Sequence, residues 1–140
     1  MPEKRAARTV LVVDDEANLR KIVSRLLENS GYRVLSAGNG KEAVKVFQAG
    51  GPVDLVILDV MMPEMDGYET LAKLKALGGQ TPHVVMLTAK QEDGDIIKGY
   101  QVGADYYVTK PFKAERVLNV VNYLIGDLPP AERAELETRL

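Results

Sequence analysis

The stretch Val53-Asp54-Leu55-Val56-Ile57-Leu58-Asp59 decides the fold of this chain. It is an apolar run with almost no alternation, which is typical of a strand buried on both faces in the middle of a parallel sheet. The run stops at Asp59, where the strand leaves the core. Open α/β sheets hold their ligands at the carboxyl ends of their strands, so Asp59 is the first candidate for chemistry. A lone Asp at this point would more readily be a turn or helix-capping residue.

The rest of the chain repeats a pattern of a short apolar strand followed by an amphipathic helix. Five such units are predicted, with strands at about 9–13, 32–37, 53–59, 83–88 and 105–109. In the first helix the expected inward residues are Leu19, Ile22, Val23, Leu26 and Leu27. The fourth helix, from about Glu92 to Val102, has few apolar residues and is expected to be the least firmly held. Parallel strands need right-handed crossovers, so the pattern predicts an α/β fold, a five-stranded parallel sheet with helices on both faces.

Composition and charge exclude several classes of function. At 140 residues, 46% hydrophobic and 27% charged, the chain fits one domain. Its net charge of -2 provides no basic surface for a nucleic-acid backbone, so we expect no direct nucleic acid binding by this segment. The absence of cysteine excludes disulfides, thiolate nucleophiles and zinc-cysteine clusters. Because no apolar run approaches the ~20 residues of a membrane span and no secretory signal is present, we expect no membrane contact and a cytoplasmic location.

The pattern divides the chain into three segments. Residues 1–8 are polar and basic and are expected to form a flexible N-terminal arm. Residues 9–125 carry the five strand-helix units. Residues 126–140 begin with a stop signal, Pro129-Pro130, and continue as a charged stretch with few apolar residues. Two interpretations of this tail remain open, a solvated terminal helix or a connector helix to something downstream.

Polar side chains follow four of the predicted strands at the point where each strand ends. They are Asp14 and Asp15, Asp59, Thr88 and Lys110. Three carboxylates and one amine give this set a charge of -2, and two carboxylates ~5 Å apart repel each other by about 3 kcal/mol at an effective dielectric constant near 20. A hard divalent cation with oxygen ligands would neutralise the set, and Mg²⁺ is the usual choice beside a phosphate. Phosphoryl oxygens could then be shared with an ammonium and a hydroxyl while an Asp attacks as nucleophile.

Four motifs in this order closely resemble the receiver domain of two-component response regulators. They are Val12-Val13-Asp14-Asp15-Glu16, Leu58-Asp59-Val60-Met61-Met62-Pro63-Glu64-Met65-Asp66-Gly67, Leu87-Thr88-Ala89 and Tyr107-Val108-Thr109-Lys110-Pro111-Phe112. The resemblance covers about residues 9–125, which are therefore expected to be a receiver domain. It implies a flavodoxin-like (βα)5 fold with strand order 2-1-3-4-5.

The resemblance also implies roles for residues of the site. Asp59 would be the phospho-acceptor. Asp14 and Asp15 would hold Mg²⁺ together with Asp59 and the backbone carbonyl of Met61. Lys110 would pair with the phosphoryl group, so that Asp59, Lys110 and Thr88 would be the catalytic residues.

Further implied features concern the switch and the lifetime of the signal. Thr88 and Tyr107 would form a switch pair in which phosphorylation draws the Thr88 hydroxyl toward the phosphoryl group and leaves room for Tyr107 to turn inward. The peptide bond before Pro111 would be cis. The side chains that flank the approach of a hydrolytic water would be Met61 and Lys90, neither of which can position a water as an acceptor.

The function implied is that of a response regulator receiver rather than an enzyme, because the domain would catalyse only its own phosphorylation and dephosphorylation. A partner histidine kinase or phosphotransfer protein would supply the phosphoryl group in a Mg-dependent reaction. The signal would leave through the surface of helix 4, strand 5 and helix 5, which is also a possible homodimer interface.

Two other functions use similar residues. A phosphatase of the haloacid dehalogenase type needs a second Asp two residues after the nucleophile, where this chain has Met61. A degenerate receiver that docks without phosphorylation would normally have lost one of the acidic or Lys positions, and none is lost here.

Overall fold

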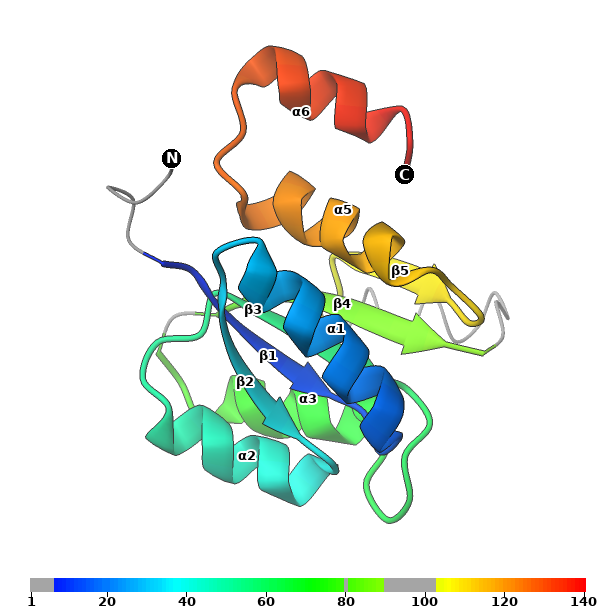
Figure 1. The fold of residues 1–140 in the computed structure, drawn as a ribbon. Helices are drawn as coiled ribbons and strands as arrows, with labels where there is room; N and C mark the ends of the chain where they lie inside the picture. Colours follow the sequence, from blue (N-terminus) through cyan, green and yellow to red (C-terminus); the bar gives the residue numbers. More distant parts are fainter. Residues whose placement is uncertain (1–6, 80, 90–102) are drawn as a thin grey trace.

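The computed structural model describes residues 7–79, 81–89 and 103–140 (Figure 1). Five parallel strands form one sheet in the order β2-β1-β3-β4-β5. The strands are β1 (Thr9–Val13), β2 (Arg33–Ala37), β3 (Leu55–Asp59), β4 (His83–Thr88) and β5 (Tyr106–Thr109). The predicted parallel α/β sheet and its strand order are confirmed.

Helices cover both faces of the sheet (Figure 1). The helices α1 (Ala17–Asn29) and α5 (Ala114–Ile125) pack on one face, and α2 (Gly40–Ala49) and α3 (Gly67–Ala76) pack on the other. The helix expected at about 92–102 lies outside the described residues. In the described part of the chain, no helix has the length and apolar character that crossing a membrane would require.

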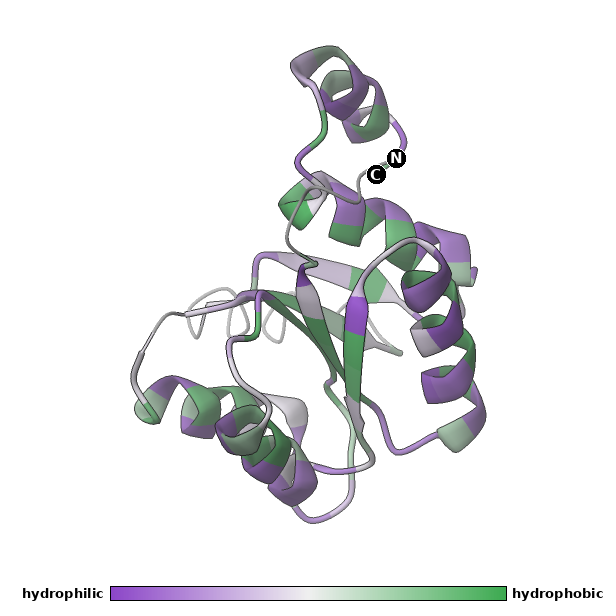
Figure 2. Cartoon of the chain, turned by 60° about the vertical axis from the view of Figure 1, so that its left-hand side comes forward, coloured by the Kyte–Doolittle hydropathy of each residue, from purple (hydrophilic) through white to green (hydrophobic). Residues whose placement is uncertain are grey.

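The central strand β3 is buried on both faces, which explains the apolar run that marks it in the sequence. Leu55 and Ile57 belong to the apolar cluster under α1 and α5, whereas Val56 and Leu58 belong to the cluster under α2 and α3. All four side chains are fully buried. Because successive strand residues point to opposite faces, a strand covered on both sides needs apolar residues at every position. Figure 2 shows the resulting hydrophobic colouring of the central strands.

One predicted core residue of α1 is exposed. Ile22 was expected on the inward face, but 57% of its surface is accessible to solvent. Val23 and Leu27, one turn apart, are the buried residues of this helix, and Leu19 packs against the same cluster. Ile22 precedes Val23 by one residue, which turns its side chain by about 100° away from the sheet. The apolar stripe of α1 is therefore wider than the surface it covers.

The C-terminal segment forms the helix α6 (Pro130–Glu137), which lies over α5 in Figure 1. Its contacts centre on Tyr123 of α5. The Arg133 guanidinium lies 4.3 Å from the centre of the Tyr123 ring, and its Nε donates to the Tyr123 backbone carbonyl at 3.1 Å. The Tyr123 hydroxyl donates to the Glu137 carboxylate. No residue of α6 is buried, so exposed polar contacts dock this helix.

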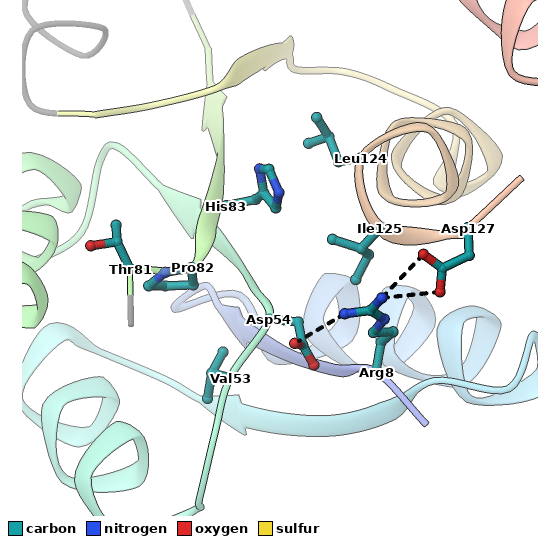
Figure 3. Close-up of a pocket in the computed structure, with 9 residues that line it drawn as sticks. All are labelled: Arg8, Val53, Asp54, Thr81, Pro82, His83, Leu124, Ile125 and Asp127. Atoms are coloured by element: carbon teal, nitrogen blue, oxygen red, sulfur yellow. Dashed lines mark hydrogen bonds and ion pairs between the residues drawn. The ribbon is translucent and has the colours of Figure 1, made fainter. Parts of the chain in front are cut away.

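Arg8 joins the start of β1 to the turn between α5 and α6, at the end of the sheet opposite the carboxyl ends of the strands (Figure 3). Its Nη2 donates to both carboxylate oxygens of Asp127 at 3.1 Å, and its Nη1 lies 3.7 Å from Oδ1 of Asp54. These groups are partly exposed, so the pairs stabilise the fold by about 1 kcal/mol at most. Arg8, assigned to the N-terminal arm from its sequence, is thus held against the domain.

Candidate functional site

The sheet brings the predicted acidic residues together because β1 and β3 are adjacent. Asp14 follows the last residue of β1, and Asp59 is the last residue of β3. The register pairs Val13 with Leu58, so the two carboxylates leave the sheet side by side. Both residues are almost fully buried, with 1% of Asp14 and 4% of Asp59 exposed.

Lys110 lies between these two carboxylates. Its Nζ is 3.2 Å from Oδ2 of Asp14 and 3.2 Å from Oδ2 of Asp59. The backbone of Lys110 is held from β4, because its N–H donates to the Thr88 carbonyl at 2.6 Å. The Lys110–Pro111 peptide bond is cis. A single ammonium therefore forms charge-assisted hydrogen bonds with two buried carboxylates.

Hydrogen bonds from the backbone orient the same two carboxylates. Oδ1 of Asp14 accepts from the Glu16 N–H at 2.9 Å, and Oδ1 of Asp59 accepts from the Met61 N–H at 3.1 Å. In each residue, Oδ1 thus accepts from the backbone N–H two residues later, and Oδ2 faces Lys110. The result is a fixed pair of carboxylates whose Oδ2 atoms face a common point.

Burial makes the charge on Asp59 costly. Loss of hydration is the main cause that raises the pKa of Asp59, and the nearby Asp14 carboxylate raises it further. Lys110 and the Met61 N–H act in the opposite direction, and the net result is a pKa of about 6. The two carboxylates in turn raise the pKa of Lys110, against the effect of its own burial. Lys110 is therefore a cation at neutral pH, whereas Asp59 bears a destabilised negative charge.

Asp15 adds a third, exposed carboxylate to the pair. Oxygen atoms of Asp14, Asp15 and Asp59 all lie within 4.8 Å of one another. Adjacent oxygens around Mg²⁺ are about 3 Å apart and opposite ones about 4.2 Å, so the three groups could share one ion after moving closer together, or through its waters. Hard carboxylate oxygens and a surplus of negative charge fit such a cation.

The remaining predicted site residues are placed as follows. Thr88 ends β4 and is buried. Met61 is 70% exposed beside Asp59. Lys90 lies outside the described residues. Tyr107 is already inward, with only 7% of its surface exposed, so the inward turn expected on phosphorylation is not required to bury this side chain.

Sequence reasoning missed the close packing behind Asp59. A Cβ atom at Gly67 would lie 2.4 Å from the Asp59 carbonyl oxygen, so only glycine fits there, and the Gly67 N–H donates to the Val60 carbonyl at 2.9 Å. Gly67 is also the first residue of α3. Asp66 caps that helix, with its side chain accepting from the Glu69 N–H and the Glu69 carboxylate accepting from the Asp66 N–H. This packing ties the start of α3 to the backbone of Asp59.

Comparison with known families identifies the same stretch of chain. Residues 10–122 match the family described as response regulator receiver domain. The alkaline phosphatase synthesis transcriptional regulatory protein PhoP of Bacillus subtilis is 43% identical over 110 residues, which are 79% of this chain and 45% of that protein. The probable transcriptional regulator ycf27 of Pyropia yezoensis is 46% identical over 108 residues, which are 77% of this chain and 43% of that protein. The matched segment thus spans less than half the length of these relatives.

Solved structures show the same fold. The chemotaxis protein CheY4 of Vibrio cholerae is 33% identical with a TM-score of 0.78. The match covers 86% of this chain and 100% of the CheY4 chain. The response regulator DrrB of Thermotoga maritima, described as an OmpR/PhoB homologue, is 34% identical with a TM-score of 0.72, and the match covers 84% of this chain and 52% of that one.

The raised pKa of Asp59 predicts an effect on stability. Asp59 binds a proton more tightly in the folded than in the unfolded protein, so the contribution of Asp59 to the stability of the metal-free protein falls as pH rises from about 4 to about 6, by up to about 3 kcal/mol. Asp59→Asn removes this loss. In urea unfolding with a chelator present, the variant should gain stability relative to wild type at about pH 8 and gain much less at about pH 4.

A control makes the same chemical change elsewhere. Asp66→Asn alters a partly exposed carboxylate that caps α3 and accepts from the Glu69 N–H, a bond that an amide oxygen can also accept, and it should show no gain at about pH 8. A gain for Asp59→Asn that is equal at both pH values would contradict the account of the site.

Proposed function

This chain belongs to the response regulator receiver domain family of two-component systems, and from that membership we propose that it receives a phosphoryl group on Asp59 from a phosphohistidine of a partner kinase or phosphotransfer protein. The observation that carries the proposal is the position of Lys110, 3.2 Å from both Asp14 and Asp59. One fixed cation beside a strand-end carboxylate offers a site for a phosphoryl oxygen next to the atom that would attack phosphorus.

The transfer uses the ionised form of Asp59. With a pKa of about 6, about nine tenths of this group is ionised at pH 7, and its burial leaves it poorly hydrated. A carboxylate oxygen attacks phosphorus, the P–N bond of the phosphohistidine breaks, and the imidazole leaves with the bond's electron pair and takes up a proton. The product is an aspartyl phosphate, and Lys110 moves from the carboxylates to the new phosphoryl oxygens.

Mg²⁺ would be held by Asp14, Asp15 and Asp59 together with the backbone carbonyl of Met61. When bound, it supplies positive charge to the phosphoryl oxygens as they approach the carboxylates. Asp14 remains fixed by the Glu16 N–H and Asp59 by the Met61 N–H, so these side chains need little reorganisation. Hydrolysis by water returns the domain to its starting state, so it acts as a signalling domain rather than as an enzyme that turns over a separate substrate.

We propose that a partner reads the signal from the surface formed by the helix expected at about 92–102 (helix 4), β5 and α5. The switch residues Thr88 and Tyr107 lie on adjacent strands at this edge of the sheet. The same surface is a candidate homodimer interface. The relatives named as transcriptional regulators are more than twice as long as the matched segment. With a net charge of -2, this segment itself is proposed to act on a protein partner rather than on nucleic acid.

Phosphorylation should occur on Asp59. Incubation with Mg²⁺ and a small acyl phosphate should add one phosphoryl group to the wild type, and Asp59→Asn should not acquire it because an amide cannot form the acyl phosphate. Intact-mass spectrometry measures the addition. Asp54→Asn, at the other end of the same apolar run, serves as the control and should still be labelled; labelling of Asp59→Asn would rule out the assignment.

Binding of Mg²⁺ should depend on Asp15. Mg²⁺ should raise the melting temperature of the wild type by mass action, and Asp15→Ala should lose most of that rise because one of three carboxylates is removed. Glu16→Ala removes a neighbouring exposed carboxylate outside the cluster and should keep most of the rise. Equal Mg²⁺-dependent rises in the wild type and in Asp15→Ala would count against the metal site.

The phosphoryl group should be longer-lived than in a variant able to position water. Met61 is 70% exposed beside Asp59 and is apolar, so it offers no acceptor to a hydrolytic water. The double variant Met61→Asn, Lys90→Glu should therefore lose phosphate faster in excess Mg²⁺, and the single Met61→Asn variant separates the two contributions. A double variant that dephosphorylates no faster than the wild type would end this proposal.

A further inference from the structure

Two buried tyrosines connect α3, the helix behind Asp59, to β5, the strand that precedes Lys110. The hydroxyls of Tyr68 in α3 and Tyr107 in β5 lie 3.2 Å apart, at hydrogen-bond distance, and 6% of Tyr68 and 7% of Tyr107 are exposed. Both side chains belong to the apolar cluster under α2 and α3. A phenol buried among apolar groups needs a polar partner for its hydroxyl, and each of these tyrosines supplies one to the other.

The position of Tyr68 is itself set by the site. It follows Gly67, which packs against the Asp59 carbonyl and leaves no room for a side chain. The start of α3 therefore cannot shift freely relative to Asp59. On the other side, Tyr107 pairs with Met86 of β4, two residues before Thr88. A connected set of contacts thus runs from the backbone of Asp59 through Tyr68 to Tyr107.

We propose that Tyr68 is a positioning residue that holds the Tyr107 side chain inward before any phosphoryl group arrives. The inference rests on the proposed function, in which Thr88 and Tyr107 form the switch pair. If Tyr68 acts in this way, phosphorylation does not create the inward position of Tyr107 in this protein. The hydrogen bond from Tyr68 already favours that position, and phosphorylation adds to an existing bias.

The preference of Tyr107 for the inward position should decrease by the contribution of one buried hydrogen bond when the Tyr68 hydroxyl is removed. Tyr68→Phe keeps the aromatic ring, so packing around it is retained, and removes only the hydroxyl. The ratio of inward to outward Tyr107 should fall by about threefold to tenfold, the range expected for one such bond. Tyr106→Phe is the matched control, because it removes the neighbouring hydroxyl of the same strand, which accepts from Arg116 on the other face of the sheet.

The test measures the exposure of the Tyr107 ring in solution. Protein with isotope-labelled tyrosine rings is titrated with an inert gadolinium chelate, and the paramagnetic relaxation of the Tyr107 ring protons is recorded by NMR. In the resting protein, Tyr68→Phe should raise this relaxation at least twofold, and Tyr106→Phe should leave it at the wild-type level. No rise in Tyr68→Phe, or an equal rise in both variants, would overturn the proposal.

The link to phosphorylation is tested on the same samples with Mg²⁺ and beryllofluoride, a stable analogue of the phosphoryl group. Exposure of Tyr107 should change little in the wild type, where the ring is already inward, and should fall back toward the wild-type value in Tyr68→Phe. A large decrease in the wild type would overturn the proposal. Because the resting-state measurement involves no phosphoryl donor, its failure is distinct from a failure of Asp59 as acceptor, which the labelling of Asp59→Asn reveals.

Discussion

The structure depends on the balance of charge at the carboxyl edge of the sheet. Asp14 and Asp59 are buried side by side, and Lys110, 3.2 Å from each, is the one cation among the described residues that pairs with them directly. Asp15 adds a further negative charge within ligand distance. Such a cluster costs stability, as the raised pKa of Asp59 indicates, and a bound divalent cation would reduce this cost. Under the proposed function, a metal ion and a phosphoryl group would together stabilise this site, which suits it to act as a switch.

The scaffold makes this costly arrangement possible by fixing the backbone on every side. Parallel pairing of β1, β3 and β4 places the strand ends in a row, and the Lys110 N–H is bonded to the Thr88 carbonyl. Gly67 lets α3 begin directly against the Asp59 carbonyl. Because these groups belong to strands and to a capped helix, the backbone around the site is held in place.

Most of the fold could be predicted from the sequence, because burial on both faces gives the central strands β1, β3 and β4 a nearly unbroken apolar signature. The residues of the acidic cluster were also predictable, since each follows such a strand. The strand order came from the resemblance rather than from the residues. Exposure of Ile22, the close approach of Gly67 to Asp59, the Tyr68–Tyr107 hydrogen bond and the ion pair of Arg8 with Asp127 were not predicted. Each depends on how the elements pack against one another, which local periodicity does not encode.

Chemical localisation of the phosphoryl group tests the central claim most directly. After incubation with an acyl phosphate and Mg²⁺, borohydride reduces an aspartyl phosphate to homoserine, and peptide mass spectrometry identifies the position that has changed. The account predicts homoserine at position 59, formed only when Mg²⁺ is present, with Asp14 and Asp15 unchanged. Reduction at Asp14 or Asp15, or no reduction at position 59 in a phosphorylated sample, would contradict it.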